Sequence, residues 1–360
     1  MHQSSFFDLS LADLTGRLAE WGEPAYRARQ AWANVYRRLV SRYDEMTDLP
    51  AGLRSRLAAE LPLAMPEALH EVRSDDGLTH KALLRLGDGR TIEAVLMRYE
   101  RDDDGRARNT VCVSSQVGCA MACGFCATGQ GGIERNLTPG EIVGQVVHFA
   151  RMLRGEEARV SNVVFMGMGE PLANYASVWR AVETLHSAEG LDIGARHITI
   201  STVGIIPGIR RLAREALPVT LAVSLHAPDD ALRQLLIPTQ RRPIAELLQA
   251  CRDYFKATGR RPSFEYCLIA GVNDSDAQAL SLARLLRNAG FPAHVNLIPL
   301  NPTPDEAYRR PARARVLSFQ RVLADAGINC TVRAEKGVEI AAACGQLRGP
   351  RLQGSLDVAL

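Results

Sequence analysis

Short apolar runs alternate with segments of helical periodicity from about residue 160 to residue 333. The runs that predict strands are 160–166, 197–203, 218–225, 263–269, 293–299 and 328–333. Apolar residues recur every three or four positions between them, which predicts helices over 175–187, 205–215, 243–257, 276–289 and 311–326. Such alternation is typical of a parallel sheet with helical crossovers. About six units of this kind predict an α/β fold, a partial (β/α)6 barrel.

The first part of the chain has a different pattern. Apolar residues recur at helical spacing between Pro24 and Val40, and residues 79–98 predict two strands joined by a Gly-Asp-Gly turn. The charged stretch 98–109 predicts a loop. Arginines on the predicted helix suit either solvent or an RNA backbone. We expect a small helical accessory, RNA-binding domain over residues 1–90, a core domain over 91–348 and a tail over 349–360.

Composition narrows the class of protein. The chain has 360 residues, of which 46% are hydrophobic and 23% charged, the balance of a globular protein. The 43 Lys and Arg against 40 Asp and Glu leave a net charge of only +3, so any nucleic-acid surface must be local. No signal peptide and no apolar run long enough for a membrane span are evident, and we expect a cytoplasmic protein without a membrane partner.

Three of the eight cysteines are closely spaced. Cys119, Cys123 and Cys126 form a C-x3-C-x2-C pattern in a segment rich in Gly, Ala and Ser. A structural zinc site normally has four ligands, whereas iron–sulfur clusters are held by thiolates. Three thiolates on a four-iron cluster would leave one iron open for chemistry. Two other interpretations stay open, namely a zinc-stabilised RNA-binding protein without catalysis and three buried cysteines that merely pack.

Polar residues follow several of the predicted strands. Gly169 and Glu170 come after 160–166, Ser201 and Ser224 lie near the ends of the next two strands, and Asn301 follows 293–299. Because ligand sites in parallel α/β folds lie at the carboxyl ends of the strands, these residues predict a binding site at one rim of the barrel.

The cysteine pattern, with Phe125 before its last cysteine, resembles the cluster motif of radical S-adenosylmethionine enzymes. The resemblance implies that Cys119, Cys123 and Cys126 hold a 4Fe-4S cluster whose fourth iron binds S-adenosylmethionine. GMGEP at 167–171 resembles the glycine-rich segment that binds the amino group in the same enzymes. Further segments resemble the RNA adenine methyltransferases of the RlmN/Cfr family: CVSSQVGCAMACGFC at 112–126, STVG at 201–204, SLHA at 224–227, NP at 301–302 and AACGQL at 342–347. This resemblance extends from about residue 25 to residue 348.

The resemblance implies roles for individual residues. It assigns S-adenosylmethionine contacts to Gly169, Glu170, Ser201, Ser224, Leu225, His226 and Asn301. Cys344 would receive a methyl group, Cys112 would resolve a covalent protein–RNA adduct through a transient disulfide, and Glu93 would accept a proton. Without the resemblance, Cys112 and Cys344 would be read as buried small residues and Glu93 as a solvent-facing strand residue. Cys251, Cys267 and Cys330 fall within helix or strand patterns and are expected to pack in the core.

The chemistry accounts for two thiols and two cofactor molecules. Carbon C2 of adenine lies between two nitrogens and is too electron-poor to attack a methyl donor, whereas a thiolate is a strong nucleophile. Two S-adenosylmethionine molecules per turnover would supply the methyl group and a 5′-deoxyadenosyl radical. The implied partners are 23S ribosomal RNA, transfer RNA and an electron donor such as flavodoxin or ferredoxin. The wording of SLHAPDD and STVGIIP favours C2 over the C8 position that another branch of the family methylates.

Overall fold

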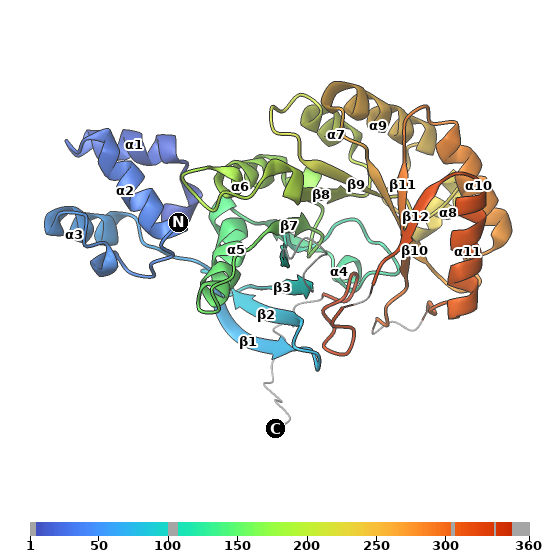
Figure 1. Ribbon diagram of the computed structural model, residues 1–360, viewed down its shortest axis with the longest axis horizontal. Coiled ribbons are helices and arrows are strands. Elements are labelled where there is room, and N and C mark those ends of the chain that lie inside the picture. The colour runs from blue at the N-terminus through green and yellow to red at the C-terminus, as the bar shows by residue number, and fades with distance from the viewer. Residues whose placement is uncertain (1–4, 100–106, 304–306, 335, 348–360) are drawn as a thin grey trace.

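A computed structural model describes residues 5–99, 107–303, 307–334 and 336–347. The chain begins with a cluster of helices at one end of the molecule (Figure 1). These are η1 Phe6–Asp8, α1 Leu11–Glu20, α2 Ala25–Tyr36, η2 Tyr43–Glu45 and α3 Ala51–Glu60. Ser10 and Asp13 form a capping box that starts α1. Phe6, Trp32 and Tyr36 pack against one another with ring centroids 4.5–6.3 Å apart and close a local core.

One sheet of ten strands forms the rest of the fold, in the order β1-β2-β3-β4-β7-β8-β9-β10-β11-β12. The first four strands pair antiparallel, and from β4 onward every neighbouring pair is parallel. The strands are β1 Glu67–Arg73, β2 Thr79–Arg85, β3 Thr91–Tyr99, β4 Arg108–Cys112, β7 Asn162–Phe165, β8 Ile198–Thr202, β9 Thr220–Ser224, β10 Ser263–Leu268, β11 His294–Pro299 and β12 Asn329–Val332. The parallel part with its crossovers is the partial barrel that the sequence predicts.

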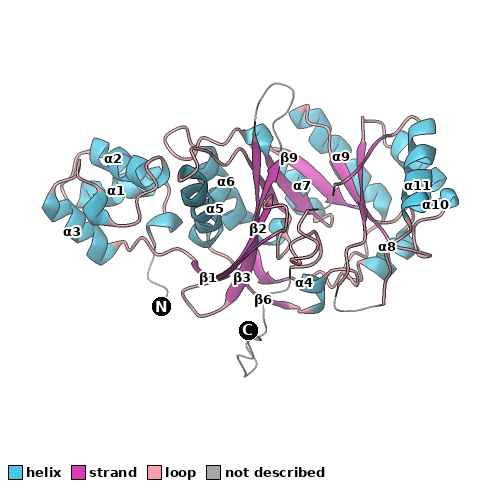
Figure 2. Ribbon diagram, turned by 60° about the horizontal axis from the view of Figure 1, so that its bottom comes forward, coloured by secondary structure: helices cyan, strands magenta, loops and turns pink. Residues whose placement is uncertain are grey.

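Helices cover the outer face of the parallel strands (Figures 1 and 2). They are α5 Pro139–Arg154, η3 Pro171–Asn174, α6 Tyr175–His186, η4 Ala195–His197, α7 Ile206–Leu212, α8 Asp230–Leu236, α9 Ile244–Thr258, α10 Asp276–Arg287 and α11 Arg313–Asp325. Thr138 and Glu141 form the predicted capping box at the start of α5. Residues facing the helices, such as Phe264 and Tyr266 of β10, are fully buried in one continuous core. The alternate residues of each strand face the inside of the barrel and are free to form a site.

The sequence prediction is confirmed for fold class and for the six parallel strands from 160 to 333, each within two residues of its observed bounds. It misses several short elements of the described chain, and two differences concern the main sheet. Strand β1 was not expected, and the charged stretch 98–109, expected to be a loop, contributes Tyr99 to β3 and Arg108 and Asn109 to β4. Residues 100–106 and the tail 349–360 lie outside the described residues.

The boundary near residue 90 stays a prediction. The last N-terminal helix, α3, ends at Glu60, and the hairpin of β1 and β2 that follows pairs with β3 in the main sheet. No helix in the described part of the chain is long and apolar enough to cross a membrane.

Candidate active site

A cavity of about 920 Å³, counting its open mouth, lies at the carboxyl ends of the parallel strands. Residues from β7 to β12 line it, together with the cysteine loop and the C-terminal segment 344–345. The position agrees with the rule for ligand sites in parallel α/β sheets. The sequence-predicted residues that line it are Cys119, Cys123, Cys126, Gly169, Glu170, Ser201, Ser224, His226, Asn301 and Cys344.

The three clustered cysteines reach the cavity from a loop between two short strands, β5 Gln116–Gly118 and β6 Ile133–Asn136, with helix α4 Ala127–Gln130 after the last cysteine. Gly118 has φ +75°, and a Cβ there would lie 2.0 Å from the carbonyl oxygen of Gly132. Only glycine therefore permits this crossing of the loop ends. Burial raises the pKa of Cys119 to about 12, and the pKa values of Cys123 and Cys126 are raised by burial as well.

The three thiols line one cavity and are the residue type that holds an iron–sulfur cluster. A tetrahedral zinc ion with Zn–S bonds of about 2.3 Å would draw its sulfur ligands to within about 4 Å of one another. Throughout the described ranges, no group of three His, Cys, Asp or Glu side chains is arranged to hold one metal ion. An iron–sulfur cluster bound by these thiols would also offset the cost of three buried thiolates.

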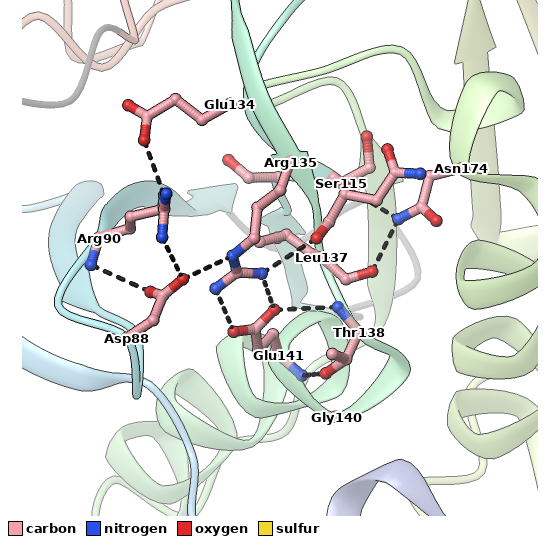
Figure 3. Close-up of polar contacts among 12 residues, drawn as sticks. Asp88, Arg90, Ser115, Glu134, Arg135, Leu137, Thr138, Gly140, Glu141 and Asn174 are labelled. Atoms are coloured by element: carbon pink, nitrogen blue, oxygen red, sulfur yellow. Dashed lines mark hydrogen bonds and ion pairs between the residues drawn. The ribbon is translucent and has the colours of Figure 1, made fainter. Parts of the chain in front are cut away.

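An ion-pair network anchors the strands that flank the cysteine loop (Figure 3). Arg135 of β6 donates to both carboxylate oxygens of Glu141, at 2.7 and 2.8 Å, and to Asp88 at 2.7 Å. Arg90 pairs with Asp88 and with Glu134, at 2.7 Å each. The turn between β2 and β3, the second strand of the cysteine hairpin and the start of α5 are thereby joined.

An amide anchors both sides of the same hairpin. Asn174, at the end of η3, donates to the carbonyl oxygens of Ser115 at 2.9 Å and Leu137 at 2.8 Å (Figure 3). These two residues precede β5 and follow β6, so the cysteine loop leaves from a fixed base. The hairpin presents the three thiols to the cavity.

The glycine-rich segment after β7 packs tightly on the cysteine hairpin. Gly169 has φ +101°, and a Cβ there would lie 2.6 Å from Cβ of Gln116. The Glu170 carboxylate accepts hydrogen bonds from the backbone N–H groups of Leu172 at 3.0 Å and Val203 at 2.8 Å. Burial raises the pKa of Glu170 to about 7. Glu170 therefore joins the ends of β7 and β8 and presents a carboxyl group to the cavity.

His226 is held as a neutral imidazole. Burial, followed by the nearby charge of Arg233, lowers its pKa to about 3, and Nδ1 accepts a hydrogen bond from the Cys267 backbone N–H at 2.9 Å. Nε2 consequently carries the ring proton and can donate it to a ligand. The ring meets Phe125 of the cysteine loop edge-on at 4.8 Å. His226 also has φ +61°, a left-handed conformation that is costly for a residue other than glycine and is often found at functional sites.

Leu225 differs from its neighbours. Its side chain is fully buried in the main core rather than in the cavity lining, because successive residues after β9 alternate between the two faces. Any contact of Leu225 with a cavity ligand would therefore have to come from its main chain.

The C-terminal segment carries Cys344 into the cavity. Asn301 donates from Nδ2 to the carbonyl oxygen of Cys344 at 3.1 Å, and the backbone N–H of Ala127 donates to that of Gly345 at 2.8 Å. Thr128 also donates to the carbonyl oxygen of Leu347. The segment is thus bonded both to the end of β11 and to the cysteine loop, two places far apart in the sequence.

Cys112 and Cys344 line a second cavity that adjoins the first. Its other lining residues include Met97 and Arg333, and Cys344 and Arg333 belong to both cavities. Burial raises the pKa of Cys112 to about 12; the neighbouring Cys344 raises it further and Arg333 opposes the shift. The structure therefore brings together two thiols that are 232 positions apart by subtraction of their residue numbers.

Glu93 is buried, at 7% exposure, and does not face solvent. Its carboxylate lies 3.1 Å from the ammonium group of Lys81. Alternate residues of a strand share a face, and Val95, two positions along β3, pairs with Cys112 of β4. Glu93 consequently belongs to the face of the sheet that carries Cys112.

Three cavity residues were missed or misjudged from the sequence. Cys267 is buried in a hydrophobic cluster as expected, but it also lines the main cavity, whereas Cys251 is fully buried in the main core. Glu265 and Arg333 also line the cavity. Ser263, Glu265 and Cys267 alternate along β10 and therefore share one face of the strand. The sequence alone does not say that this face points into the barrel.

Comparison with known proteins gives consistent matches. Residues 113–283 match the radical SAM superfamily, and residues 5–62 match the ribosomal RNA large subunit methyltransferase N-terminal domain. A relative from Chloroflexus aurantiacus, named a probable dual-specificity RNA methyltransferase RlmN, is 53% identical over 97% of this chain and 94% of its own length.

Two further matches cover most of the chain. A ribosomal RNA large subunit methyltransferase N from Nitrosopumilus maritimus is 49% identical over 91% of this chain and 94% of its own. The crystal structure of a radical SAM methyltransferase from Sphaerobacter thermophilus superposes with a TM-score of 0.91 at 55% identity, covering 96% of this chain and 99% of that one.

Proposed function

The chain belongs to the RlmN family of radical S-adenosylmethionine RNA methyltransferases, and we propose that it methylates C2 of adenine in 23S ribosomal RNA and in transfer RNA. The observation that carries this proposal is the meeting of Cys344 with the cysteine loop and with Cys112 in two adjoining cavities. A methyl relay through a thiol needs such a pair, one to carry the methyl group and one to release the product.

Membership of the family implies a 4Fe-4S cluster and S-adenosylmethionine, and the cavity offers groups that fit both. Cys119, Cys123 and Cys126 would hold the cluster. Gly169, Glu170, Ser201, Ser224, His226 and Asn301 would contact S-adenosylmethionine, with Leu225 contributing its main chain. When bound, the cluster and S-adenosylmethionine would together supply a 5′-deoxyadenosyl radical, formed by one-electron cleavage of S-adenosylmethionine.

The two thiols, Cys344 and Cys112, would have different roles. Cys344 would accept a methyl group from one S-adenosylmethionine molecule, and a second molecule would serve the radical step, giving two per turnover. Burial raises the pKa of Cys112 to about 12, which favours its protonated form and makes it the weaker nucleophile towards the methyl donor. After losing its proton, Cys112 would attack the sulfur of the protein–RNA adduct. The bond between that sulfur and the bridging methylene carbon would break, the carbon would keep the electron pair and take up a proton to become the methyl group of the RNA, and a transient Cys112–Cys344 disulfide would remain.

Glu93 would accept the proton that leaves C2. Its burial, its ion pair with Lys81 and its place on the Cys112 face of the sheet support this role. Lys81 also donates to the carbonyl oxygen of Ala341 at 3.3 Å, which joins the Glu93 strand to the segment that carries Cys344. The lysine thereby holds the carboxylate and the thiol segment in one arrangement.

The electron would come from a small carrier such as flavodoxin or ferredoxin. A catalytic disulfide that must be reduced after each turnover is the kind found in a reducing compartment, so we place the protein in the cytoplasm. The target adenine would have to be unstacked to reach the cavity.

Product analysis tests the proposal. The cluster-reconstituted protein is incubated with trideuteromethyl S-adenosylmethionine, reductant and either 23S ribosomal RNA or transfer RNA, and the nucleosides are resolved by mass spectrometry. We expect labelled 2-methyladenosine from both RNAs. Labelled 8-methyladenosine without 2-methyladenosine would assign the other ring position, and a colourless protein with stoichiometric zinc would favour a non-catalytic RNA-binding protein.

A further inference from the structure

Arg233 of α8 is a buried arginine that joins the ends of two neighbouring parallel strands. It is only 2% exposed and does not line the main cavity. Its Nη2 group donates to the carbonyl oxygen of Val203, the residue after β8, and lies 3.5 Å from the carbonyl oxygen of Ser224, the last residue of β9. A Cβ on Gly204 would lie 3.4 Å from the same Nη2, so this part of the chain encloses the guanidinium closely.

The positive charge of Arg233 makes no ion pair within the part of the chain that the structure describes. Both acceptors of Nη2 are neutral carbonyl groups, and Nε is buried there without a hydrogen-bond partner. The nearby Asp230 carboxylate instead accepts a hydrogen bond from the backbone N–H of Ile244 at 2.6 Å. Burial lowers the pKa of Arg233 to about 10, opposed most by Asp230 and next by the Cys123 thiol, so the side chain keeps its charge at neutral pH. A buried charge is costly unless an opposite charge lies close to it.

Packing places this charge beside the cysteine loop. The carbonyl oxygen of Leu236, on the next turn of α8, accepts a hydrogen bond from the backbone N–H of Gly124 at 3.2 Å. Leu236 and Val203 also belong to one buried hydrophobic group with Cys123, which agrees with the electrostatic effect of Cys123 on Arg233. Arg233 is therefore a fixed positive charge next to a residue expected to hold the cluster.

The reduction potential of an iron–sulfur cluster depends on its net charge and on the charges and hydrogen bonds around it. Uptake of one electron makes the cluster and its thiolates more negative. A positive charge held close by stabilises that reduced form, and it does so more strongly in the protein interior than in water. The reduced cluster would in turn supply the negative charge that Arg233 lacks among the described residues.

We propose that Arg233 is a positioning residue that acts through Cys123 and raises the reduction potential of the cluster. One electron would pass from the reduced carrier to the cluster with no bond made or broken, and Arg233 would shift this equilibrium towards the reduced cluster. The guanidinium is not part of the cavity lining, so this role needs no contact with S-adenosylmethionine or RNA. The inference rests on the proposed cluster.

The test measures the potential of the cluster rather than turnover. Wild type and variants are reconstituted without oxygen, their iron and sulfide are quantified, and electron paramagnetic resonance follows the reduced cluster during a redox titration. At the potential that half-reduces the wild type, we expect the ratio of reduced to oxidised cluster to be about tenfold lower in Arg233→Met. Arg233→Gln can still donate a hydrogen bond but has no charge, and it should show the same loss. Arg233→Lys keeps the charge and should stay within about threefold of the wild type.

Arg151→Met is the matched control. Burial lowers the pKa of Arg151 of α5 as well, and its guanidinium also donates to two backbone carbonyl oxygens, those of Leu39 at 3.1 Å and Val40 at 2.6 Å. Because these carbonyl groups follow α2, in the N-terminal helices, the variant should lose stability but keep the wild-type potential. Wild-type potentials in both uncharged Arg233 variants, or an equal shift in Arg151→Met, would overturn the inference. A wild-type protein that binds zinc and no iron–sulfur cluster would contradict the proposed function itself.

Discussion

The ion-pair network at the base of the cysteine hairpin and the neighbouring cavity differ in how completely their polar atoms are hydrogen-bonded. In the network, both oxygens of Asp88 and both oxygens of Glu141 accept hydrogen bonds. In the cavity, Oε2 of Glu265 and Oδ1 of Asn301 are buried without a partner among the described residues. Several cavity thiols are also buried with pKa values raised by that burial.

This difference indicates that the network stabilises the fold and that the cavity binds a ligand. A saturated network stabilises the fold and holds the loop, whereas unsatisfied groups cost stability and are expected where a ligand is to satisfy them. We therefore expect variants in the cavity to affect chemistry more than stability, and variants in the network to do the reverse. The following predictions test that division, beginning with the largest effect.

Removing the Cys344 thiol should have the largest effect. Cys344→Ala should lower RNA methylation by a factor on the order of 10³ or more, because no other described residue is proposed to carry the methyl group. Iron content and S-adenosylhomocysteine affinity should stay at wild-type values. Cys330→Ala, a cysteine variant on β12 outside both cavities, is the control and should remain active. Normal turnover by Cys344→Ala would remove the methyl relay from the account.

Removing the Cys112 thiol should stop release of the methylated RNA but not formation of the protein–RNA adduct. Cys112→Ala should accumulate a covalent protein–RNA species, visible on a denaturing gel as a slow band that nuclease treatment shifts to nearly the position of the unmodified protein, with the linked adenine nucleotide retained. Multiple turnover should be lost while one labelled methylene bridge per chain forms. Cys251→Ala alters a cysteine of the helical core and should give no adduct. Free methylated RNA at the wild-type rate from Cys112→Ala would contradict its role.

A network variant should affect stability instead. Arg135→Met removes the paired hydrogen bonds to Glu141 and the bond to Asp88, and we expect the free energy of unfolding to fall by about 1–2 kcal/mol, since the guanidinium is partly open to water. Arg90→Met, at a more exposed position, should cost less. Denaturant titration of both variants measures the order. A larger loss for Arg90→Met would contradict the importance of the bidentate pair.

The two regions should also differ in their response to pH. His226 has its pKa lowered to about 3 by burial, so the unfolded chain binds a proton below about pH 6.5 that the folded chain does not. Stability due to neutral His226 is complete above that pH and declines as pH falls towards 3. The Arg135 hydrogen bond holds the pKa of Asp88 below its usual range, so its contribution persists until pH falls below about 4.

Thermal unfolding between pH 7 and pH 5 separates these contributions. His226→Gln should flatten the decline in stability by about 1 kcal/mol per pH unit at most, and Asp88→Asn should lower the whole curve without changing its slope. Parallel curves for wild type and His226→Gln would show that the imidazole binds protons equally in the folded and unfolded protein, which would contradict the lowered pKa of His226.

The strands differ in how well the sequence predicts them, for reasons that lie in particular residues. The parallel strands were predictable because both faces of each are covered, which gives apolar runs such as 160–166. Strand β1 was not, because six of its seven residues are exposed and its register with β2 is irregular at Ala68 and His70. Strand β4 begins inside a charged stretch, and only its pairing with β3 and β7 reveals it.

The site residues were predictable where metal binding or a sequence motif fixes their spacing along the chain. Cys119, Cys123 and Cys126 stand close in sequence, and a motif identified Cys344. Glu265 and Arg333 belong to no such motif. Glu265 lies on the inner face of β10, Arg333 comes directly after β12, and both line the cavity. That information exists only in the packed sheet.

The central claim is that Cys344 carries the methyl group into the cavity, and peptide mass spectrometry tests it directly. The wild-type and Cys112→Ala proteins are incubated with trideuteromethyl S-adenosylmethionine and digested, and the peptide that contains Cys344 is fragmented. The account predicts one labelled methyl group on the Cys344 sulfur before RNA is added and its transfer to adenine afterwards. Label on RNA with an unmodified Cys344 at every time point would contradict the account.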